Sequence, residues 1–194
     1  MPPEPPKGWH SRGYLPHLDV PGLLQVITFH LADSMPRETL RRLMAETEKR
    51  DIERRRRLEE LLDAGHGACW LRRPAIGATV EQALLSGDGE RYRLLAWVVM
   101  PNHVHLVIET FQDAPLASVV KGWKGATAHT ANALLGRSGA FWEREYYDRY
   151  IRDDAHLAAA VRYIHRNPVK AGLVQRPEDW PFSSARFLRP EADD

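Results

Sequence analysis

An α+β fold is predicted by two side-chain patterns and by the size of the chain. Short segments in which apolar and polar residues alternate, as in β-strands, are interspersed with longer segments in which apolar residues recur every three or four positions, as in amphipathic helices. With 194 residues, 43% of them hydrophobic and 27% charged, the chain can form one domain with its own core. The expected order is strand, two helices, two strands, helix, strand and helix.

The first part of the chain is expected to contain one strand and two helices. The strand is the segment LQVITFHL at 24–31, whose two faces differ in character. A helix should begin near Pro36, which suits a first turn, and end at Gly65. Its middle, residues 46–57, is almost wholly charged, and the interspersed acidic residues favour a solvated helix face over a nucleic-acid contact. A shorter helix fits residues 75–86.

The middle of the chain predicts a β-hairpin followed by a helix. The run RYRLLAWVVM at 91–100 is nearly all apolar, as in a strand that is covered on both faces. A Met-Pro-Asn turn at 100–102 then returns the chain as HVHLVIE, the expected partner strand. A helix is expected over 115–135, because Pro115 suits its first turn and Gly136 its end.

A last strand and a last helix complete the order. The segment EYYDRYI at 145–151 reads as a strand, and Asp153 should cap a helix that runs to Asn167. Pro168 is expected to end this helix, because the residue before a proline disfavours the α conformation. A central hairpin flanked by β-α and α-β units is the ferredoxin-like, or split βαβ, pattern. We therefore expect an antiparallel sheet with helices mainly on one face, plus an extended first helical region.

The expected organisation is an extended N-terminal arm over 1–21, a single domain over 22–188 and a tail over 189–194. The arm is predicted because its segment is rich in proline. Residues 46–90 are expected to form a helical elaboration of the single domain.

Composition excludes several classes of protein. The single cysteine, Cys69, can form neither an internal disulfide nor a thiolate metal cluster, which indicates a reducing compartment. The N-terminus has no apolar stretch typical of a signal peptide, and the longest apolar run is too short to span a bilayer. The formal net charge is only +1, so a nucleic-acid site, if present, must be local. We expect a cytoplasmic protein with no membrane partner.

Two histidines lie on one face of the predicted hairpin. Residues i and i+2 of a strand project to the same side, so His103 and His105 point one way while Val104 and Leu106 point the other. Two imidazoles on adjacent pleats can bind one cation, although partly exposed histidines without a ligand remain the alternative. A histidine-triad nucleotide hydrolase would need a third histidine where Val107 stands. A barrel metallohydrolase would need about 250 residues.

The last predicted helix adds a phenol and an amide. Tyr163 and Asn167 are four residues apart and therefore share one face of the helix. Each alone has an ordinary explanation, since tyrosines often edge a packed face and asparagines often precede a helix end. Together with His103 and His105, they predict a cation held by two imidazoles and an amide oxygen. The phenol beside that cation could attack a phosphorus atom.

These motifs occur together and in one order in a known family. The chain resembles the REP-associated tyrosine transposases, the single-tyrosine branch of the HUH endonucleases and relatives of the insertion-sequence 200-like transposases, over roughly residues 12–188. The resemblance is carried by VVMPNHVHLVIE, FWEREYYDRYIRDDAHLAAAVRYIHRNPVKAGLV and EDWPFSS. It implies that His103, His105 and Asn167 bind Mg²⁺ or Mn²⁺ and that Tyr163 is the nucleophile. It also implies a ferredoxin-like palm. On this resemblance, the single domain over 22–188 is an HUH transposase-like catalytic domain.

The resemblance implies a metal-dependent endonuclease and strand transferase. Members cut single-stranded DNA at or near hairpins and leave a 5′-phosphotyrosine with a free 3′-hydroxyl. The partner would be single-stranded or hairpin DNA, and the protein a monomer or homodimer in the bacterial cytoplasm, associated with the nucleoid. A non-cleaving hairpin-binding module on the same fold is the alternative, and a phosphohydrolase without a covalent step is another. The intact motif residues favour the transposase.

DNA contacts are expected from the N-terminal arm and from the helix over 115–135. Lys121 and Lys124 are expected on an exposed side of that helix, where they would contact phosphates. Arg12 would contact bases or phosphates, and Trp9 and Tyr14 would stack on unpaired bases. For Trp9, packing across the domain is the alternative. The family's use of an N-terminal segment to recognise DNA beside the hairpin favours the DNA contact.

Overall fold

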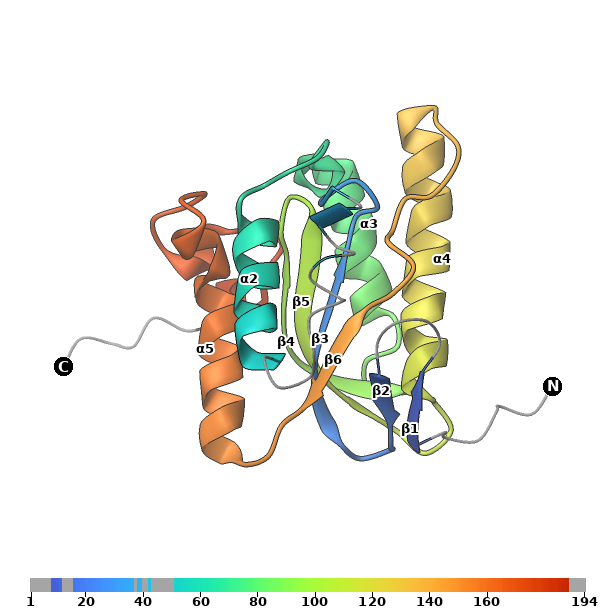
Figure 1. Ribbon diagram of the computed structural model, residues 1–194, viewed down its shortest axis with the longest axis vertical. Coiled ribbons are helices and arrows are strands. Elements are labelled where there is room, and N and C mark those ends of the chain that lie inside the picture. Colours follow the sequence, from blue (N-terminus) through green and yellow to red (C-terminus); the bar gives the residue numbers. More distant parts are fainter. Residues whose placement is uncertain (1–7, 12–15, 37, 40–41, 43–50, 189–194) are drawn as a thin grey trace.

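The computed structural model describes residues 8–11, 16–36, 38–39, 42 and 51–188, which form a four-stranded sheet covered by helices on both faces (Figure 1). Short 3₁₀ helices lie at Trp70–Arg72, Pro177–Asp179 and Ser184–Phe187. The strands and longer helices are, in chain order, β1 Gly8–Ser11, β2 Pro16–Asp19, β3 Leu24–His30, α2 Asp51–Asp63, α3 Pro74–Leu85, β4 Tyr92–Val99, β5 His103–Thr110, α4 Leu116–Leu135, β6 Tyr147–Tyr150 and α5 Asp154–Lys170.

The strands of the sheet follow the order β4-β5-β3-β6, and every neighbouring pair is antiparallel. The hairpin of β4 and β5 therefore lies beside β3, and β6, the last strand of the chain, pairs with the other edge of β3. A first strand flanked by the third and fourth strands of the motif defines the ferredoxin-like topology. The predicted α+β, split βαβ fold is confirmed.

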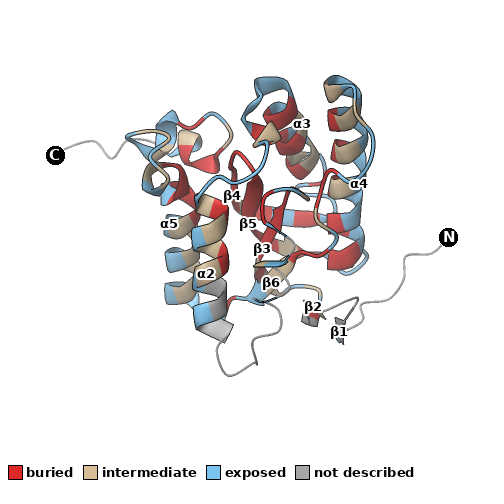
Figure 2. Ribbon diagram, turned by 45° about the horizontal axis from the view of Figure 1, so that its top comes forward, coloured by how far each residue is buried: buried red, intermediate tan, exposed pale blue. Residues whose placement is uncertain are grey.

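Apolar side chains on the two faces of the sheet form two separate cores. On one face, Ile27, Phe29 and Leu106 pack beneath α3 and α4, the helices of the two βαβ units. On the other face, Val98 and Val107 pack against α5. Figure 2 shows the buried central strands between these layers. Helices were expected mainly on one face, but they divide between the two: α3 and α4 cover one face, and α5 covers the other with its apolar stripe against the sheet.

Helix α2 lies beside α5, over the same face of the sheet (Figure 1). Leu58 and Leu62 of α2 are buried against Met35. The expected single helix from Pro36 to Gly65 can be assessed only in part, because residues 43–50 lie outside the described residues. What is described of it ends at Asp63, as the sequence predicted to within two residues.

Pro168 does not end α5, contrary to expectation, and the helix continues to Lys170. A proline inside a helix removes one N–H donor and with it one backbone hydrogen bond. The neighbouring carbonyls keep partners, because Ala171 N donates to Asn167 O at 2.9 Å and Leu173 N donates to Pro168 O at 2.9 Å. The last turn therefore survives, and Asn167 stays inside the helix.

The N-terminal segment, expected to be extended, contains the antiparallel pair β1 and β2. This hairpin is fixed to β6 by buried polar contacts. His17 bonds Asp148 Oδ1 through Nδ1 at 2.5 Å and Glu145 Oε2 through Nε2 at 3.1 Å, and Leu18 N donates to Asp148 Oδ2 at 2.8 Å. Burial alone lowers the pKa of His17, but the hydrogen bonds and charges of the two carboxylates outweigh burial and raise it.

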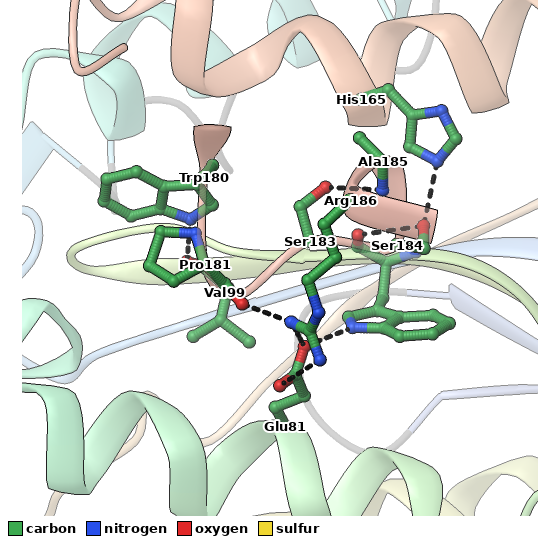
Figure 3. A network of polar contacts seen from close by, with 10 residues as sticks. Glu81, Val99, His165, Trp180, Pro181, Ser183, Ser184, Ala185 and Arg186 are labelled. Atoms are coloured by element: carbon green, nitrogen blue, oxygen red, sulfur yellow. Dashed lines mark hydrogen bonds and ion pairs between the residues drawn. The ribbon is translucent and has the colours of Figure 1, made fainter. Parts of the chain in front are cut away.

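The C-terminal segment covers the outer edge of β4 (Figure 3). Trp180 Nε1 donates to Val99 O at 2.9 Å, and Val99 N donates to Phe182 O at 2.8 Å. Arg186 forms an ion pair with the buried Glu81 of α3, at 2.6 Å and 3.0 Å. Because an exposed edge strand can pair with other chains, this cover protects the sheet. In the described part of the chain, no helix is long and apolar enough to cross a membrane.

Candidate active site

The two histidines of the HVH motif lie on the face of the sheet beneath α2 and α5. In the register of β3 and β5, His103 stands opposite His30 and His105 opposite Thr28. His103 and His105 are buried, and their ring centroids are 4.6 Å apart. The alternative of two partly exposed strand histidines is therefore wrong, and the shared face predicted from their spacing is confirmed.

Hydrogen bonds fix the orientation of both imidazoles. Asn102 Nδ2 donates to Leu62 O at 3.2 Å and to His66 O at 3.1 Å, so Asn102 Oδ1 is left to accept from His103 Nδ1 at 2.7 Å. The proton of neutral His103 consequently sits on Nδ1 and the lone pair on Nε2. The orientation of His105 is fixed by the hydrogen bond between Nδ1 and Thr28 Oγ1 at 2.7 Å.

Burial keeps both histidines neutral. It lowers the pKa of His103 well below its ordinary value, and unfavourable electrostatic interactions of a charged His103 with His105, His30 and Lys170 add to the effect. It lowers the pKa of His105 to about 3, and Lys170 adds to the effect. Neutral imidazole is the form that binds a metal ion, so the pair is ready to act as a ligand at neutral pH.

Helix α5 brings Tyr163 and Asn167 to the same face. The ring of Tyr163 lies 5.6 Å from the ring of His105, edge to face. Asn167, one turn further along α5, is fully buried, and neither its amide oxygen nor its amide nitrogen has a hydrogen-bond partner among the described residues. Burial, followed by the negative charges of Glu59 and Asp63, raises the pKa of Tyr163. The phenol is therefore protonated at neutral pH in the metal-free protein.

Helix α2 contributes two carboxylates that the sequence analysis missed. Asp63 Oδ1 lies 3.9 Å from His103 Nε2, and Asp63 Oδ2 accepts from Lys170 Nζ at 2.7 Å. Glu59, one turn earlier, is half-buried, and burial raises its pKa. The two acids are four residues apart, next to the buried Leu58 and Leu62. That spacing is the signal that could have separated them from the solvated charges of this helix.

The site opens into a cavity of about 270 Å³ between the sheet, α2 and α5. Tyr163 and His105 line it at one side, and Glu59 lines it from α2. Tyr147 and Arg149 of β6 complete its wall. The nucleophile expected from the sequence therefore faces a space into which a substrate group can enter.

The residues of this site fit a divalent cation. Among the buried side-chain atoms that have no hydrogen-bond partner in the described part of the chain, three belong to this pair of histidines and to Asp63: His103 Nε2, His105 Nε2 and Asp63 Oδ1, here called the acceptor cluster. Buried acceptors are normally satisfied, and His103 Nε2 and Asp63 Oδ1, which lie 3.9 Å apart, would be stabilised by a positive charge between them. Within the described residues no three His, Cys, Asp or Glu side chains are already assembled as a metal site. An amide ligand such as Asn167, which mixed nitrogen and oxygen sites allow, is therefore consistent with the structure.

The expected DNA-contacting residues lie elsewhere. Lys121 is exposed on α4, across the sheet from the acceptor cluster. Lys124 is not on an exposed side as expected: its ammonium is half-buried and donates to the carbonyls of Glu143, Arg144 and Glu145, at 2.6, 2.8 and 3.3 Å. Burial lowers its pKa to about 8. Trp9 is 65% exposed on β1 and does not pack across the domain. Arg12 and Tyr14 lie outside the described residues.

Residues 86–167, which include the HVH strand and reach Tyr163 and Asn167 on α5, match the family described as "Transposase IS200 like". This matched segment contains the β4–β5 hairpin and ends at Asn167. The chain is 30% identical to the REP-associated tyrosine transposase of Escherichia coli K12, over 48% of this chain and 54% of the relative. It is 28% identical to a candidate REP-associated tyrosine transposase of Haemophilus influenzae, over 48% of this chain and 58% of the relative.

A solved structure shows the same fold over most of the chain. It is that of a REP-associated tyrosine transposase bound to a REP hairpin, with a TM-score of 0.58 and 20% sequence identity, and it covers 90% of this chain and 86% of that one. The resemblance found in the sequence motifs is thus confirmed. The matched segments span little more than half the length of the two curated relatives.

Proposed function

We propose that the protein is a metal-dependent tyrosine transposase that cuts and rejoins single-stranded DNA at hairpins. The observation that carries this proposal is the position of the Tyr163 ring, beside the acceptor cluster and at the wall of an open cavity. A protein that only bound hairpins would need neither the buried histidine pair nor the tyrosine. On this proposal, residues 22–188 act as one catalytic domain.

In this proposal, His103, His105 and Asn167 hold Mg²⁺ or Mn²⁺. The bound ion would supply positive charge that neutralises the scissile phosphate and the developing phenolate. Asn102 keeps His103 in the ligand-competent tautomer, and Thr28 holds the orientation of His105. Burial under α2 and α5 keeps water from competing for the same lone pairs.

Tyr163 attacks phosphorus in the proposed reaction. Its phenol oxygen forms a bond to the phosphorus atom while the bond from phosphorus to the 3′ oxygen breaks, and the released 3′ oxygen takes up a proton from water, which leaves a 5′-phosphotyrosine and a free 3′-hydroxyl. The phenol proton needs an acceptor, and Glu59 lines the same cavity with a pKa that burial raises. A 3′-hydroxyl that attacks the phosphotyrosine would reverse these bond changes and rejoin the strand.

The proposed DNA partner follows from the relatives. The structural neighbour is described as bound to a REP hairpin, so we propose hairpin DNA for this chain as well. Lys121, which is exposed, is proposed to contact phosphates, and Arg12 and Tyr14 of the N-terminal segment to contact bases. Lys124 is the weaker candidate, because its ammonium already serves three backbone carbonyls.

The proposal is tested by incubating the protein with end-labelled single-stranded DNA that contains a hairpin, with and without Mn²⁺. A labelled adduct that survives denaturing electrophoresis is expected with Mn²⁺ and should be lost in Tyr163→Phe. Tyr150→Phe is the matched control, because Tyr150 is a 42%-exposed tyrosine of β6. Hairpin binding without cleavage would favour the binding module. Cleavage that persists in Tyr163→Phe without an adduct would favour a phosphohydrolase.

A further inference from the structure

Asp63 directs a carboxylate oxygen toward the histidine pair from the C-terminal end of α2. Its side chain is 11% exposed, and Asp63 Oδ1 lies 3.9 Å from His103 Nε2. That separation is too long for a hydrogen bond. Both atoms belong to the acceptor cluster, so each lacks a hydrogen-bond partner among the residues that the structure describes.

The tautomer of His103 determines how its Nε2 interacts with Asp63 Oδ1. Because Asn102 Oδ1 accepts the proton of His103 Nδ1, a neutral His103 presents only a lone pair at Nε2. A carboxylate oxygen and an imidazole lone pair repel one another, and in a buried site this repulsion is screened little. A cation between the two atoms would turn the repulsion into attraction. Two ligand atoms at about 2.1 Å from one ion can be at most about 4.2 Å apart, and the observed 3.9 Å lies within that limit.

Lys170 holds Asp63 in this orientation. Its ammonium donates to Asp63 Oδ2 at 2.7 Å, which occupies one carboxylate oxygen and leaves Oδ1 for another partner. The same ammonium lies 5.5 Å from the ring centroid of Tyr163. Lys170 belongs to α5, so the ion pair fastens the end of α2 to the helix that carries the proposed nucleophile and the amide ligand.

We infer that Asp63 is a carboxylate ligand of the catalytic cation, positioned by Lys170. The inference rests on the proposed function, since it concerns the same ion. The two neutral imidazoles and the amide of Asn167 bring no negative charge, whereas Mg²⁺ and Mn²⁺ prefer sites with carboxylate oxygens. Asp63 lies outside the family-matched segment at 86–167, so helix α2 completes a site that the matched domain holds only in part.

The test measures Mn²⁺ binding to the full-length protein, by following the paramagnetic resonance signal of free Mn²⁺ during a titration. Asp63→Asn, which keeps the shape of the side chain, should weaken Mn²⁺ affinity by at least about tenfold. Glu60→Gln should leave it unchanged, because Glu60 lies on the same helix with its side chain 58% exposed beside Arg56. Asp63→Ala is the second variant, and thermal unfolding of each metal-free variant shows that it is folded.

The variant Lys170→Met shows whether Asp63 is a ligand of the cation or only the ion-pair partner of Lys170. If Asp63 binds the cation, Lys170→Met keeps the carboxylate and should weaken Mn²⁺ binding less than Asp63→Asn does. If Asp63 serves only the ion pair, both variants lower the unfolding temperature alike while Asp63→Asn binds Mn²⁺ as the wild type does, and the inference is overturned. His103→Ala combined with His105→Ala should abolish Mn²⁺ binding. Wild-type binding by that double variant would refute the proposed metal site itself, not only the role of Asp63.

Discussion

Thr28→Val is the sharpest test of how the sheet prepares the histidine pair. The substitution replaces one hydroxyl by a methyl group of similar size and removes the partner of His105 Nδ1, which lies 2.7 Å from Thr28 Oγ1. Both side chains are buried, so the imidazole nitrogen would be left without water or protein to bond. Leaving a buried polar group unsatisfied costs about 1–3 kcal/mol, and we expect a loss of that size in the free energy of unfolding.

The same substitution should also weaken metal binding. A ligating histidine owes its orientation to the hydrogen bond of its other nitrogen, and loss of such a bond typically lowers metal affinity about 10- to 100-fold. Urea unfolding gives the stability, and a Mn²⁺ titration gives the affinity. Thr130→Val is the control, because Thr130 is exposed on α4 and bonds only the Ala126 carbonyl of its own helix, at 3.2 Å.

A double-mutant cycle shows whether the loss of stability passes through His105. In a His105→Ala background, Thr28→Val has no imidazole to leave unsatisfied, so its cost should fall close to zero. The reasoning is refuted if Thr28→Val costs as much in that background as in the wild type. It is refuted equally if the single variant keeps both wild-type stability and wild-type Mn²⁺ affinity.

Three further predictions concern residues away from the metal site. Lys124→Met should destabilise the fold by about 2–4 kcal/mol in urea unfolding, because it strands carbonyls that now accept a charge-assisted hydrogen bond. Lys121→Met should leave the stability unchanged, lower the affinity for all DNA sequences alike and reduce the salt dependence of DNA binding. If instead Lys121→Met lowered the stability and Lys124→Met lowered the DNA affinity, the roles assigned to the two lysines would be wrong. The raised pKa of His17 means that its stabilising bonds to Asp148 and Glu145 are fully present below about pH 6.5 and are lost as the pH rises through the folded-state pKa. The stability difference between wild type and His17→Gln should therefore shrink with rising pH, and a constant difference would exclude a protonated His17.

The sheet and its histidine face followed from the sequence because they depend on local rules. Alternation along β5 fixes that His103 and His105 share a side, and the Met-Pro-Asn turn fixes the hairpin. The spacing of Tyr163 and Asn167 likewise fixes one face of α5. Which side chains share a face of a strand or helix depends only on the local backbone geometry, not on contacts with the rest of the chain.

Other features depend on contacts between distant segments and could not be read from local patterns. Asp63 lies in one of the most charged parts of the chain, and its ion pair with Lys170 of α5 and its approach to His103, both from distant segments, distinguish it from the solvated acids around it. Lys124 looked like an exposed basic residue, but the segment before β6 folds back and places three carbonyls at its ammonium. Pro168 violates a local preference because the carbonyls around it find other donors.

Mass spectrometry of the covalent protein–DNA adduct tests the central claim most directly. After cleavage of hairpin DNA in the presence of Mn²⁺, nuclease and trypsin digestion should leave a nucleotide on the peptide 163–166, since Arg162 and Arg166 flank Tyr163. The tyrosines of 145–149 and 150–152 fall in separate tryptic peptides and should be unmodified. A nucleotide found on either of those peptides, or cleaved DNA with no modified peptide at all, would contradict the assignment of Tyr163 as the nucleophile.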